Sequence, residues 1–256
     1  MILFFDIDST LVENRFSRRA LGEVLEEIAP FSGKSVRELA REIGIENERR
    51  QQTDPDHPLT MDWDDILLSI AMRYGVSLTK HGIDLWNAYA HADEVDVIDD
   101  APLVLSELKQ MGHTLVIATK GLWKYQEPVL RVTGLLPFFD DILTPDLTGY
   151  LKTSPAYFNK YTVNGTSGMV HIGDHYYDDV ICARRNGFIS IMRASTPELQ
   201  NMLRPFDAFE RPNHVLQYAE FIPTFPKTNT TVLPNAIVVS LRELPKIVKK
   251  LENQIR

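Results

Sequence analysis

The chain begins with a short apolar run that ends abruptly in acidic and polar residues. Residues 2–5 are all apolar, and Asp6-Ile7-Asp8-Ser9-Thr10 follow them. A continuous apolar run of this length is typical of a strand buried on both faces, as in a parallel sheet. The pattern therefore predicts a buried parallel strand whose carboxyl end leads into a loop carrying Asp6.

The next stretch, residues 15–91, has the pattern of successive helices and contains no strand of comparable quality. Its apolar residues recur three and four positions apart, which places them on one face of each helix. Ser35 and Glu38 have the spacing of a capping box at a helix start. Residues 46–58 are polar and contain proline, so we expect an exposed loop there. The predicted apolar stripes are Leu21, Val24, Leu25 and Ile28, then Leu39 and Ile43, then Ile66, Leu67, Ile70 and Ala71.

From about residue 99 onward, short apolar runs alternate with helical patterns. This alternation predicts βα units and a parallel sheet. Glycines such as Gly112, Gly134 and Gly187 stand where the helices are expected to end. We expect strands near residues 114–118, 142–143, 169–172, 190–192 and 236–239, and a closing amphipathic helix over residues 241–254.

The order of these elements predicts the fold class. We expect an α/β protein with a Rossmann-like parallel sheet, helices on both faces of the sheet, and a helical bundle inserted after the first strand. The α/β domain is then discontinuous, with residues 1–14 and 93–256, and the helical domain spans residues 15–92. The two crossings, near Asn14 and Asp93, are natural hinges.

Two carboxylates stand at the end of the first expected strand. Asp6 and Asp8 are two residues apart in the sequence. Adjacent anions raise one another's pKa unless a cation lies between them. The pair therefore indicates either a site for a hard divalent metal or acid–base catalysis. The ordinary alternative is a strand-ending turn rich in Asp and Ser.

Three further polar segments lie at the carboxyl ends of expected strands or at the starts of helices, where open α/β sheets bind ligands. A hydroxyl with turn amides, or a lysine beside a helix start, suits a phosphate group. Each segment also has an ordinary alternative: a helix-capping threonine, a solvated lysine, or acids that complement a helix dipole. The segments are Thr119-Lys120-Gly121, Lys152-Thr153-Ser154-Pro155, and Gly173-Asp174 with Asp178 and Asp179.

Taken in order, the four segments resemble the four signature motifs of the haloacid dehalogenase superfamily. The resemblance spans residues 2 to about 193, and the helical block resembles the family's movable cap. With Ser9, the first motif is similar to that of phosphoserine phosphatases. The cap and the last two motifs are instead similar to those of the phosphoglycolate-phosphatase branch. The matching residues are Asp6-x-Asp8-x-Thr10, Thr119, Lys152-x-x-Pro155-x-x-Phe158 and Gly173-Asp174-x-x-x-Asp178-Asp179.

The resemblance implies a phosphohydrolase that acts on a small phosphorylated metabolite through an aspartyl-phosphate. Asp6 would be the nucleophile, and Asp8 would be the general acid and base. Thr119 and Lys152, and with them Lys120, would bind the phosphoryl oxygens and stabilise the charge on the transferring group.

The resemblance also implies a Mg²⁺ cofactor and its ligands. The Asp6 carboxylate, the Asp8 backbone carbonyl and Asp174 would hold the ion, and Asp178 or Asp179 would orient these ligands from behind. Haloacid dehalogenases lack a carboxylate at the position of Asp8, because a halide needs no protonation when it leaves. Phosphoryl chemistry is therefore favoured over dehalogenation.

Other functions stay open on the same core. A phosphomutase would return the phosphate to a sugar. A phosphonatase would need a Schiff-base lysine on the cap, for which Lys34 is the one suggestive candidate. A binding or regulatory module without catalysis is a third possibility, and the intact set of motif residues argues against it.

Composition narrows the partners. A formal net charge of −8 argues against a nucleic-acid partner, because such partners need a basic surface. Cys182 is the single cysteine, so no intramolecular disulfide and no cysteine zinc cluster can form. No apolar stretch is long enough for a membrane span or has the pattern of a signal peptide. We expect a cytoplasmic protein that is a monomer or a homodimer.

Some residues near the motifs do not follow the family pattern. Taken by itself, Lys120 is expected to point to solvent, and Tyr176 and Tyr177 are expected to pack under the cap. Residues 195–233 are rich in Pro and Phe, and we expect them to cover a sheet edge, with a subunit contact as the alternative. Three cap arginines are candidates for selecting the substrate, namely Arg15, Arg18 and Arg19.

Overall fold

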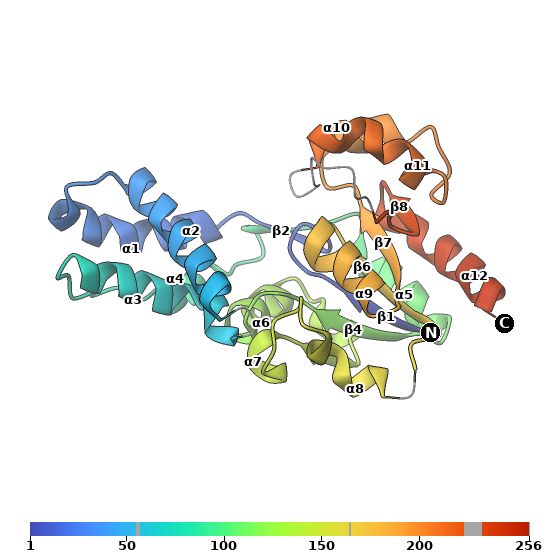
Figure 1. Cartoon of the computed structure of the whole chain (residues 1–256), viewed down its shortest axis with the longest axis horizontal. Coiled ribbons are helices and arrows are strands. Elements are labelled where there is room, and N and C mark those ends of the chain that lie inside the picture. The colour runs from blue at the N-terminus through green and yellow to red at the C-terminus, as the bar shows by residue number, and fades with distance from the viewer. Residues whose placement is uncertain (55–56, 164, 223–231, 256) are drawn as a thin grey trace.

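The computed structural model describes residues 1–54, 57–163, 165–222 and 232–255. Its main sheet has strand order β5-β4-β1-β6-β7-β8, and every neighbouring pair is parallel (Figure 1). The expected α/β fold class is confirmed. The strands are β1 (Ile2–Phe5), β4 (Thr114–Ala118), β5 (Asp141–Leu143), β6 (Met169–Gly173), β7 (Ile189–Arg193) and β8 (Ala236–Val238).

Helices cover both faces of this sheet. Successive strand residues point to opposite sides, and the strands are apolar on both. Leu3 and Phe5 of β1 pack against α5, α6 and α12 on one face. Phe4 packs on the other face against η3 and the segment around α9, and Met192 packs there against α10 and α11. These helices are α5 (Ala101–Gln110), α6 (Trp123–Val132), α7 (Pro145–Thr148), α8 (Asn159–Thr162), α9 (Cys182–Arg185), α10 (Pro197–Leu203), α11 (Arg211–Val215) and α12 (Leu244–Ile255).

Several shorter helical turns complete the α/β part. The turn after Lys152 differs from the expectation, because the helix predicted to begin at Pro155 is a short 3₁₀ turn followed by the four-residue α8. The segment that carries Asp178 and Asp179 is a π-helical turn that leads into α9. The turns are η2 (Leu136–Phe138), η3 (Pro155–Phe158), η4 (Tyr176–Ile181), η5 (Leu216–Phe221) and η6 (Leu241–Glu243).

The inserted helices form a group beside the sheet, which we call the cap (residues 15–92; Figure 1). All the expected apolar stripes meet in one cap core, in which Leu25, Leu39 and Ile70 are buried and Leu21 is partly buried. Ser35 and Glu38 make the predicted capping box. The cap elements are α1 (Ser17–Ser32), α2 (Val36–Thr53), η1 (Pro58–Met61), α3 (Trp63–Arg73) and α4 (Gly82–Tyr89).

The prediction of a loop over residues 46–58 is wrong for residues 46–53. Helix α2 continues to Thr53, so Glu46 is helical and only 5% exposed. Its carboxylate accepts hydrogen bonds from Arg49 and Arg50, which keep the polar stretch helical through ion pairs three and four residues apart. Polarity at these positions reflects an ion-pair network and not a chain break.

A two-stranded antiparallel ribbon lies where the chain crosses between the α/β part and the cap. Strand β2 (Val12–Asn14) pairs with β3 (Val95–Val97). Neither strand was predicted from the sequence, because each has only three residues and includes an acidic one. The two crossings therefore run side by side.

The segment after β7 covers the outer edge of the sheet, as the sequence analysis favoured. The edge strand β8 donates its Ile237 amide to the Ala208 carbonyl at 2.9 Å, and Arg211 donates to the Ile237 carbonyl at 2.9 Å. Backbone groups that would otherwise face solvent are thereby paired. Phe225, one of the aromatic residues noted in this segment, lies outside the described residues. None of the described helices is both long enough and apolar enough to cross a membrane.

Candidate active site at the carboxyl ends of β1 and β6

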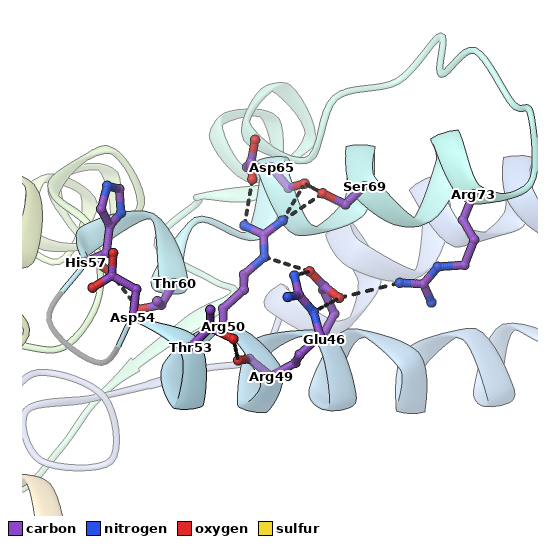
Figure 2. A pocket seen from close by; sticks show the side chains of 10 residues that line it. All are labelled: Glu46, Arg49, Arg50, Thr53, Asp54, His57, Thr60, Asp65, Ser69 and Arg73. Atoms are coloured by element: carbon purple, nitrogen blue, oxygen red, sulfur yellow. Dashed lines mark hydrogen bonds and ion pairs between the residues drawn. The ribbon is translucent and has the colours of Figure 1, made fainter.

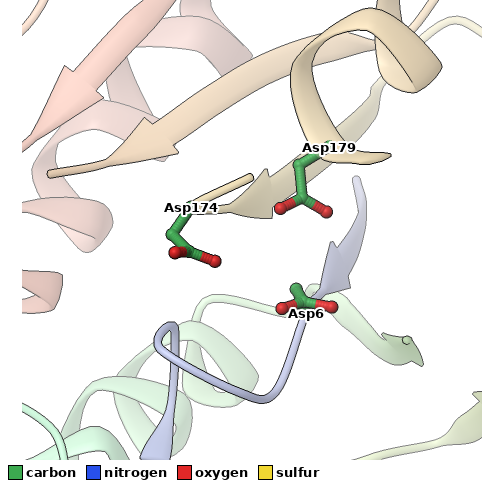
Figure 3. Close-up of side chains that lie close together, drawn as sticks. All are labelled: Asp6, Asp174 and Asp179. Atoms are coloured by element: carbon green, nitrogen blue, oxygen red, sulfur yellow. The ribbon is translucent and has the colours of Figure 1, made fainter. Parts of the chain in front are cut away.

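Three carboxylates converge at the carboxyl ends of the two central strands. Asp6 follows β1, Asp174 follows β6, and Asp179 lies in η4. One oxygen of each lies within 4.8 Å of the others, and Figure 3 shows the three side chains facing a common point. The parallel pairing of β1 with β6 brings together residues that are more than 160 positions apart. The arrangement concentrates negative charge where a cation would be held.

Lys152 balances part of this charge from beneath. Its Nζ lies 2.8 Å from Oδ1 of Asp6 and 2.6 Å from Oδ1 of Asp179. The side chain is only 1% exposed, so the ordinary alternative of a solvated surface lysine does not hold. A buried ammonium is stable only when paired, and these two carboxylates supply the pairing.

Gly173 makes room for Asp179. A Cβ added at Gly173 would stand 2.1 Å from the carboxyl carbon of Asp179, whereas ordinary contacts begin at 3.4 Å. Asp179 uses this space to accept a hydrogen bond from the His175 amide at 2.7 Å. The glycine is therefore needed for a close approach between β6 and η4.

The pKa shifts reflect burial and the surrounding charges. Burial raises the pKa of Asp6 well above its ordinary value, Asp179 and Asp174 add to the rise, and Lys152 opposes it. Burial, followed by the charge of Asp179, raises the pKa of Asp174 to about 7. Burial acts to raise the pKa of Asp179 as well, but Lys152 and His171 hold it below its ordinary value. A cation bound between these carboxylates would stabilise their charged forms.

Asp8 faces a different partner from the three clustered acids. Its Oδ2 accepts a hydrogen bond from Nε2 of Gln126 at 2.8 Å. Burial raises the pKa of Asp8, and the Gln126 bond acts against this rise. Asp8 and Asp6 line the same cavity, and Gln126, which was not predicted from the sequence, reaches Asp8 from α6, 118 residues away.

The second motif and the fourth motif meet beside the acidic cluster. Thr119 is 2% exposed at the end of β4, and its Oγ1 accepts a hydrogen bond from the Gly121 amide at 3.2 Å. Lys120 does not point freely to solvent, because its Nζ lies 3.2 Å from Oδ2 of Asp178. Asp178 thus pairs with Lys120 and is outside the three-carboxylate cluster, whereas Asp179 is inside it.

A cavity of about 310 Å³ opens above these residues. The α/β part supplies its acidic and polar wall. The cap supplies Met61, Trp63 and Trp86, which were not predicted from the sequence. A larger cavity of about 600 Å³ lies within the cap between α2 and α3 (Figure 2). Its Arg49, Arg50 and Arg73 are already paired with Glu46, so the smaller cavity is the better candidate active site.

Several residues expected near the site lie elsewhere. Arg15 pairs with Asp96 and Arg19 with Glu94, and the cavity is lined by neither of them nor by Arg18. Tyr176 is buried among α/β residues such as Met192 and not under the cap, and Tyr177 is 49% exposed. Lys34 pairs with Glu42, which raises the pKa of the lysine, and Lys34 does not line the cavity either.

The fold and the site define a class of protein, namely capped α/β enzymes with an acidic centre at the carboxyl edge of a parallel sheet. The sequence model of the haloacid dehalogenase-like hydrolases matches residues 1–187. The chain therefore belongs to the haloacid dehalogenase-like hydrolase family, and it is a hydrolytic enzyme.

Among sequence relatives, the chain is similar to a glyceraldehyde 3-phosphate phosphatase of Pyrococcus abyssi, at 25% identity over 74% of this chain and 79% of the relative. It is also similar to the human haloacid dehalogenase-like hydrolase domain-containing protein 3, at 26% identity over 79% of this chain and 85% of the relative.

Solved structures share the fold. A haloacid dehalogenase-type phosphatase from Thermococcus onnurineus has a TM-score of 0.65 and 22% identity, over 96% of this chain and 97% of that one. A 2-haloacid dehalogenase from Pseudomonas syringae pv. Tomato DC3000 has a TM-score of 0.65 and 20% identity, over 98% and 99%. Because phosphatases and dehalogenases have the same architecture, these likenesses describe the fold alone.

Proposed function

We propose that the chain is a magnesium-dependent phosphohydrolase that cleaves a small phosphomonoester through an aspartyl-phosphate on Asp6. The observation that carries this proposal is the convergence of Asp6, Asp174 and Asp179 within 4.8 Å at the floor of a cavity that Asp8 also lines. The glyceraldehyde 3-phosphate phosphatases among the relatives support a small phosphorylated metabolite as the substrate class.

The donor set suits a hard cation. Asp6, Asp174 and Asp179 offer only carboxylate oxygens, the ligands that Mg²⁺ prefers. This assignment differs from the sequence-based one in giving Asp179, which was expected to act from behind, a place among the ligands. The Asp8 carboxylate is bonded to Gln126, so only its backbone carbonyl would take part. When bound, the ion would offset the clustered negative charge and draw electron density from the phosphoryl oxygens.

The residues of the chain account for the two chemical steps. A carboxylate oxygen of Asp6 bonds to phosphorus while the bond from phosphorus to the leaving oxygen breaks, and Asp8 donates a proton to that oxygen. Asp8 then accepts a proton from the water that attacks phosphorus, which releases phosphate and restores Asp6. Thr119 and Lys152 bind the phosphoryl group and stabilise its charge.

The first test is release of phosphate from p-nitrophenyl phosphate, with and without Mg²⁺. Asp6→Asn keeps the side-chain shape and removes the nucleophilic charge, so we expect a loss of activity of at least about a thousandfold. Asp84→Asn changes an exposed cap aspartate and should leave the rate unchanged. Full activity in Asp6→Asn would refute the nucleophile, and activity independent of metal would refute the role of the acidic cluster.

A phosphonatase is disfavoured by the surroundings of Lys34. A Schiff-base lysine needs a lowered pKa, whereas pairing with Glu42 raises the pKa of Lys34. Trapping with borohydride and phosphonoacetaldehyde should therefore yield no adduct. A cytoplasmic location, the absence of a nucleic-acid partner, the domain limits near residues 14 and 93, and a monomeric or homodimeric state stay predictions.

A further inference from the structure

The wall that the cap contributes to the active-site cavity carries no charge. Its three residues are Met61 from η1, Trp63 from α3 and Trp86 from α4. Met61 and Trp86 are each 7% exposed, so they are fixed in place by packing. The Trp86 indole already donates to the Tyr125 carbonyl at 2.8 Å and makes edge contacts with Phe16 and Tyr125. This wall offers a leaving group apolar and aromatic surface.

The two lysines nearest the acidic cluster are already paired with carboxylates. Lys152 lies between Asp6 and Asp179 beneath the site. Lys120 is the sole Lys or Arg among the described residues that line the cavity, and it pairs with Asp178. A second anionic group on the leaving group would therefore meet apolar surface on the cap side, and that surface cannot compensate its lost hydration.

We propose that the enzyme selects phosphomonoesters whose leaving group is an uncharged alcohol with apolar surface, and rejects those carrying a second phosphate or a carboxylate. This inference rests on the proposed function and adds the substrate class to it. The discrimination comes from the cap wall, because its three side chains give the cavity lining its apolar part from the cap. A site that leaves a charged group unpaired discriminates more strongly than one that gains or loses a methylene.

Matched substrate pairs test this selection directly on the wild-type enzyme. The pairs are ethyl phosphate against carboxymethyl phosphate, and phenyl phosphate against 4-carboxyphenyl phosphate, each measured at saturating Mg²⁺. We expect kcat/KM to be at least about tenfold higher for the uncharged member of each pair. Equal or higher kcat/KM for the carboxylates would overturn the inference while leaving the phosphatase proposal intact, whereas no hydrolysis of any monoester would overturn the phosphatase proposal itself.

A charge placed in the wall should weaken the preference for the uncharged substrates. In Met61→Lys we expect the ratio within each pair to shift by about tenfold toward the carboxylate, with a circular dichroism spectrum like that of the wild type. Leu68→Lys adds the same charge at an exposed position of α3 and should leave the ratio unchanged. A ratio in Met61→Lys that stays at the wild-type value, with the fold intact, would show that the wall does not select.

A separate observation concerns the polar contact to Asp8. Gln126 is 4% exposed, and its Nε2 donates to Asp8 at 2.8 Å. The amide fits only because residue 121 is glycine, since a Cβ there would stand 2.2 Å from Nε2 of Gln126. The neighbouring Tyr125 binds the cap, with its hydroxyl donating to Asp62 and accepting from the Asp64 amide.

We infer that Gln126 is a positioning residue that holds the Asp8 carboxylate toward the leaving oxygen. Asp8 has two rotatable torsions, and a buried amide fixed by packing restricts them. Tyr125, which contacts the cap, directly precedes Gln126 on α6. The same helix therefore contacts the cap and holds Gln126 in place. This inference also rests on the proposed function, because it assumes that Asp8 protonates the leaving group.

The test uses substrates that differ in how much they need an acid. In Gln126→Met, we expect kcat/KM to fall about tenfold more for ethyl phosphate than for p-nitrophenyl phosphate, because p-nitrophenolate leaves without a proton. Glu127→Gln, at the neighbouring position of the same helix, should change neither value. A structural role alone would lower both values equally in Gln126→Met, and that result, or no loss at all, would overturn the inference.

Discussion

Replacing Gly173 by alanine should disable the site while leaving the fold intact. The added Cβ would stand 2.1 Å from the carboxyl carbon and 2.2 Å from Oδ2 of Asp179, where ordinary contacts start at 3.4 Å. The Asp179 carboxyl group must therefore move by more than an ångström. That movement disturbs the contact of Asp179 with Lys152 and its convergence with Asp6 and Asp174.

The expected size of the effect follows from this displacement. Misplacing a catalytic group by about 1 Å costs roughly 100-fold in rate, and disturbing the ligand set of a metal costs about 10–100-fold in affinity. In Gly173→Ala we therefore expect kcat/KM for p-nitrophenyl phosphate to fall about 100-fold. The Mg²⁺ concentration for half-maximal activity should rise at least about tenfold.

The assay is a set of initial rates over a range of Mg²⁺ concentrations, with circular dichroism to monitor the fold. Gly44→Ala is the matched control, because an added Cβ there meets nothing within 4 Å and the position is an exposed helix interior. It should keep full activity and gain up to about 1 kcal/mol of stability. Wild-type activity and metal dependence in Gly173→Ala would refute the close approach of Asp179 as a requirement.

Three further predictions concern stability. Arg211→Met should lose about 3 kcal/mol in urea unfolding, because it removes the cation that pairs with Glu243 and the donor to the Ile237 carbonyl. Arg242→Met removes only an exposed pair and should lose under about 0.5 kcal/mol. Equal losses would contradict the edge-covering role. Ser9 has φ 56°, so Ser9→Gly should stabilise the chain by about 1 kcal/mol, and a fall in melting temperature would contradict this. Arg49 and then Arg50 lower the pKa of Glu46 to about 2, so its contribution is complete above about 4.5 and is lost as the pH falls towards 2. The stability difference between wild type and Glu46→Gln, roughly 1–2 kcal/mol because Arg49 is exposed, should shrink over that range, and a constant difference would refute the pairing.

Local sequence patterns predicted some of the residues that line the site and not others. Asp6, Thr119 and Asp174 were found because each directly follows an apolar run, and parallel strands deliver their carboxyl ends to one edge. Gln126 could not be found this way, since it lies in the middle of an amphipathic helix whose polar positions are ordinarily exposed. Gly121 was its one local sign, because a glycine directly after a strand can mark a close approach.

The choice between Asp178 and Asp179 also required tertiary structure. The two residues are adjacent and chemically identical, so the sequence left both as candidates. The π-helical turn η4 directs Asp179 to Lys152 and Asp178 to Lys120. A wider turn changes which side chain faces inward, and no local pattern here predicted that turn.

The sequence by itself determined the fold class, the inserted helical cap and the set of motif residues, because these depend on apolar periodicity and on the order of elements along the chain. Tertiary structure alone decided which acids converge, which amide holds Asp8, and that Met61, Trp63 and Trp86 line the same cavity as the motif residues. The physical reason is that these contacts join residues far apart in the chain. Their geometry is set by how the cap and the sheet pack together and not by any local preference.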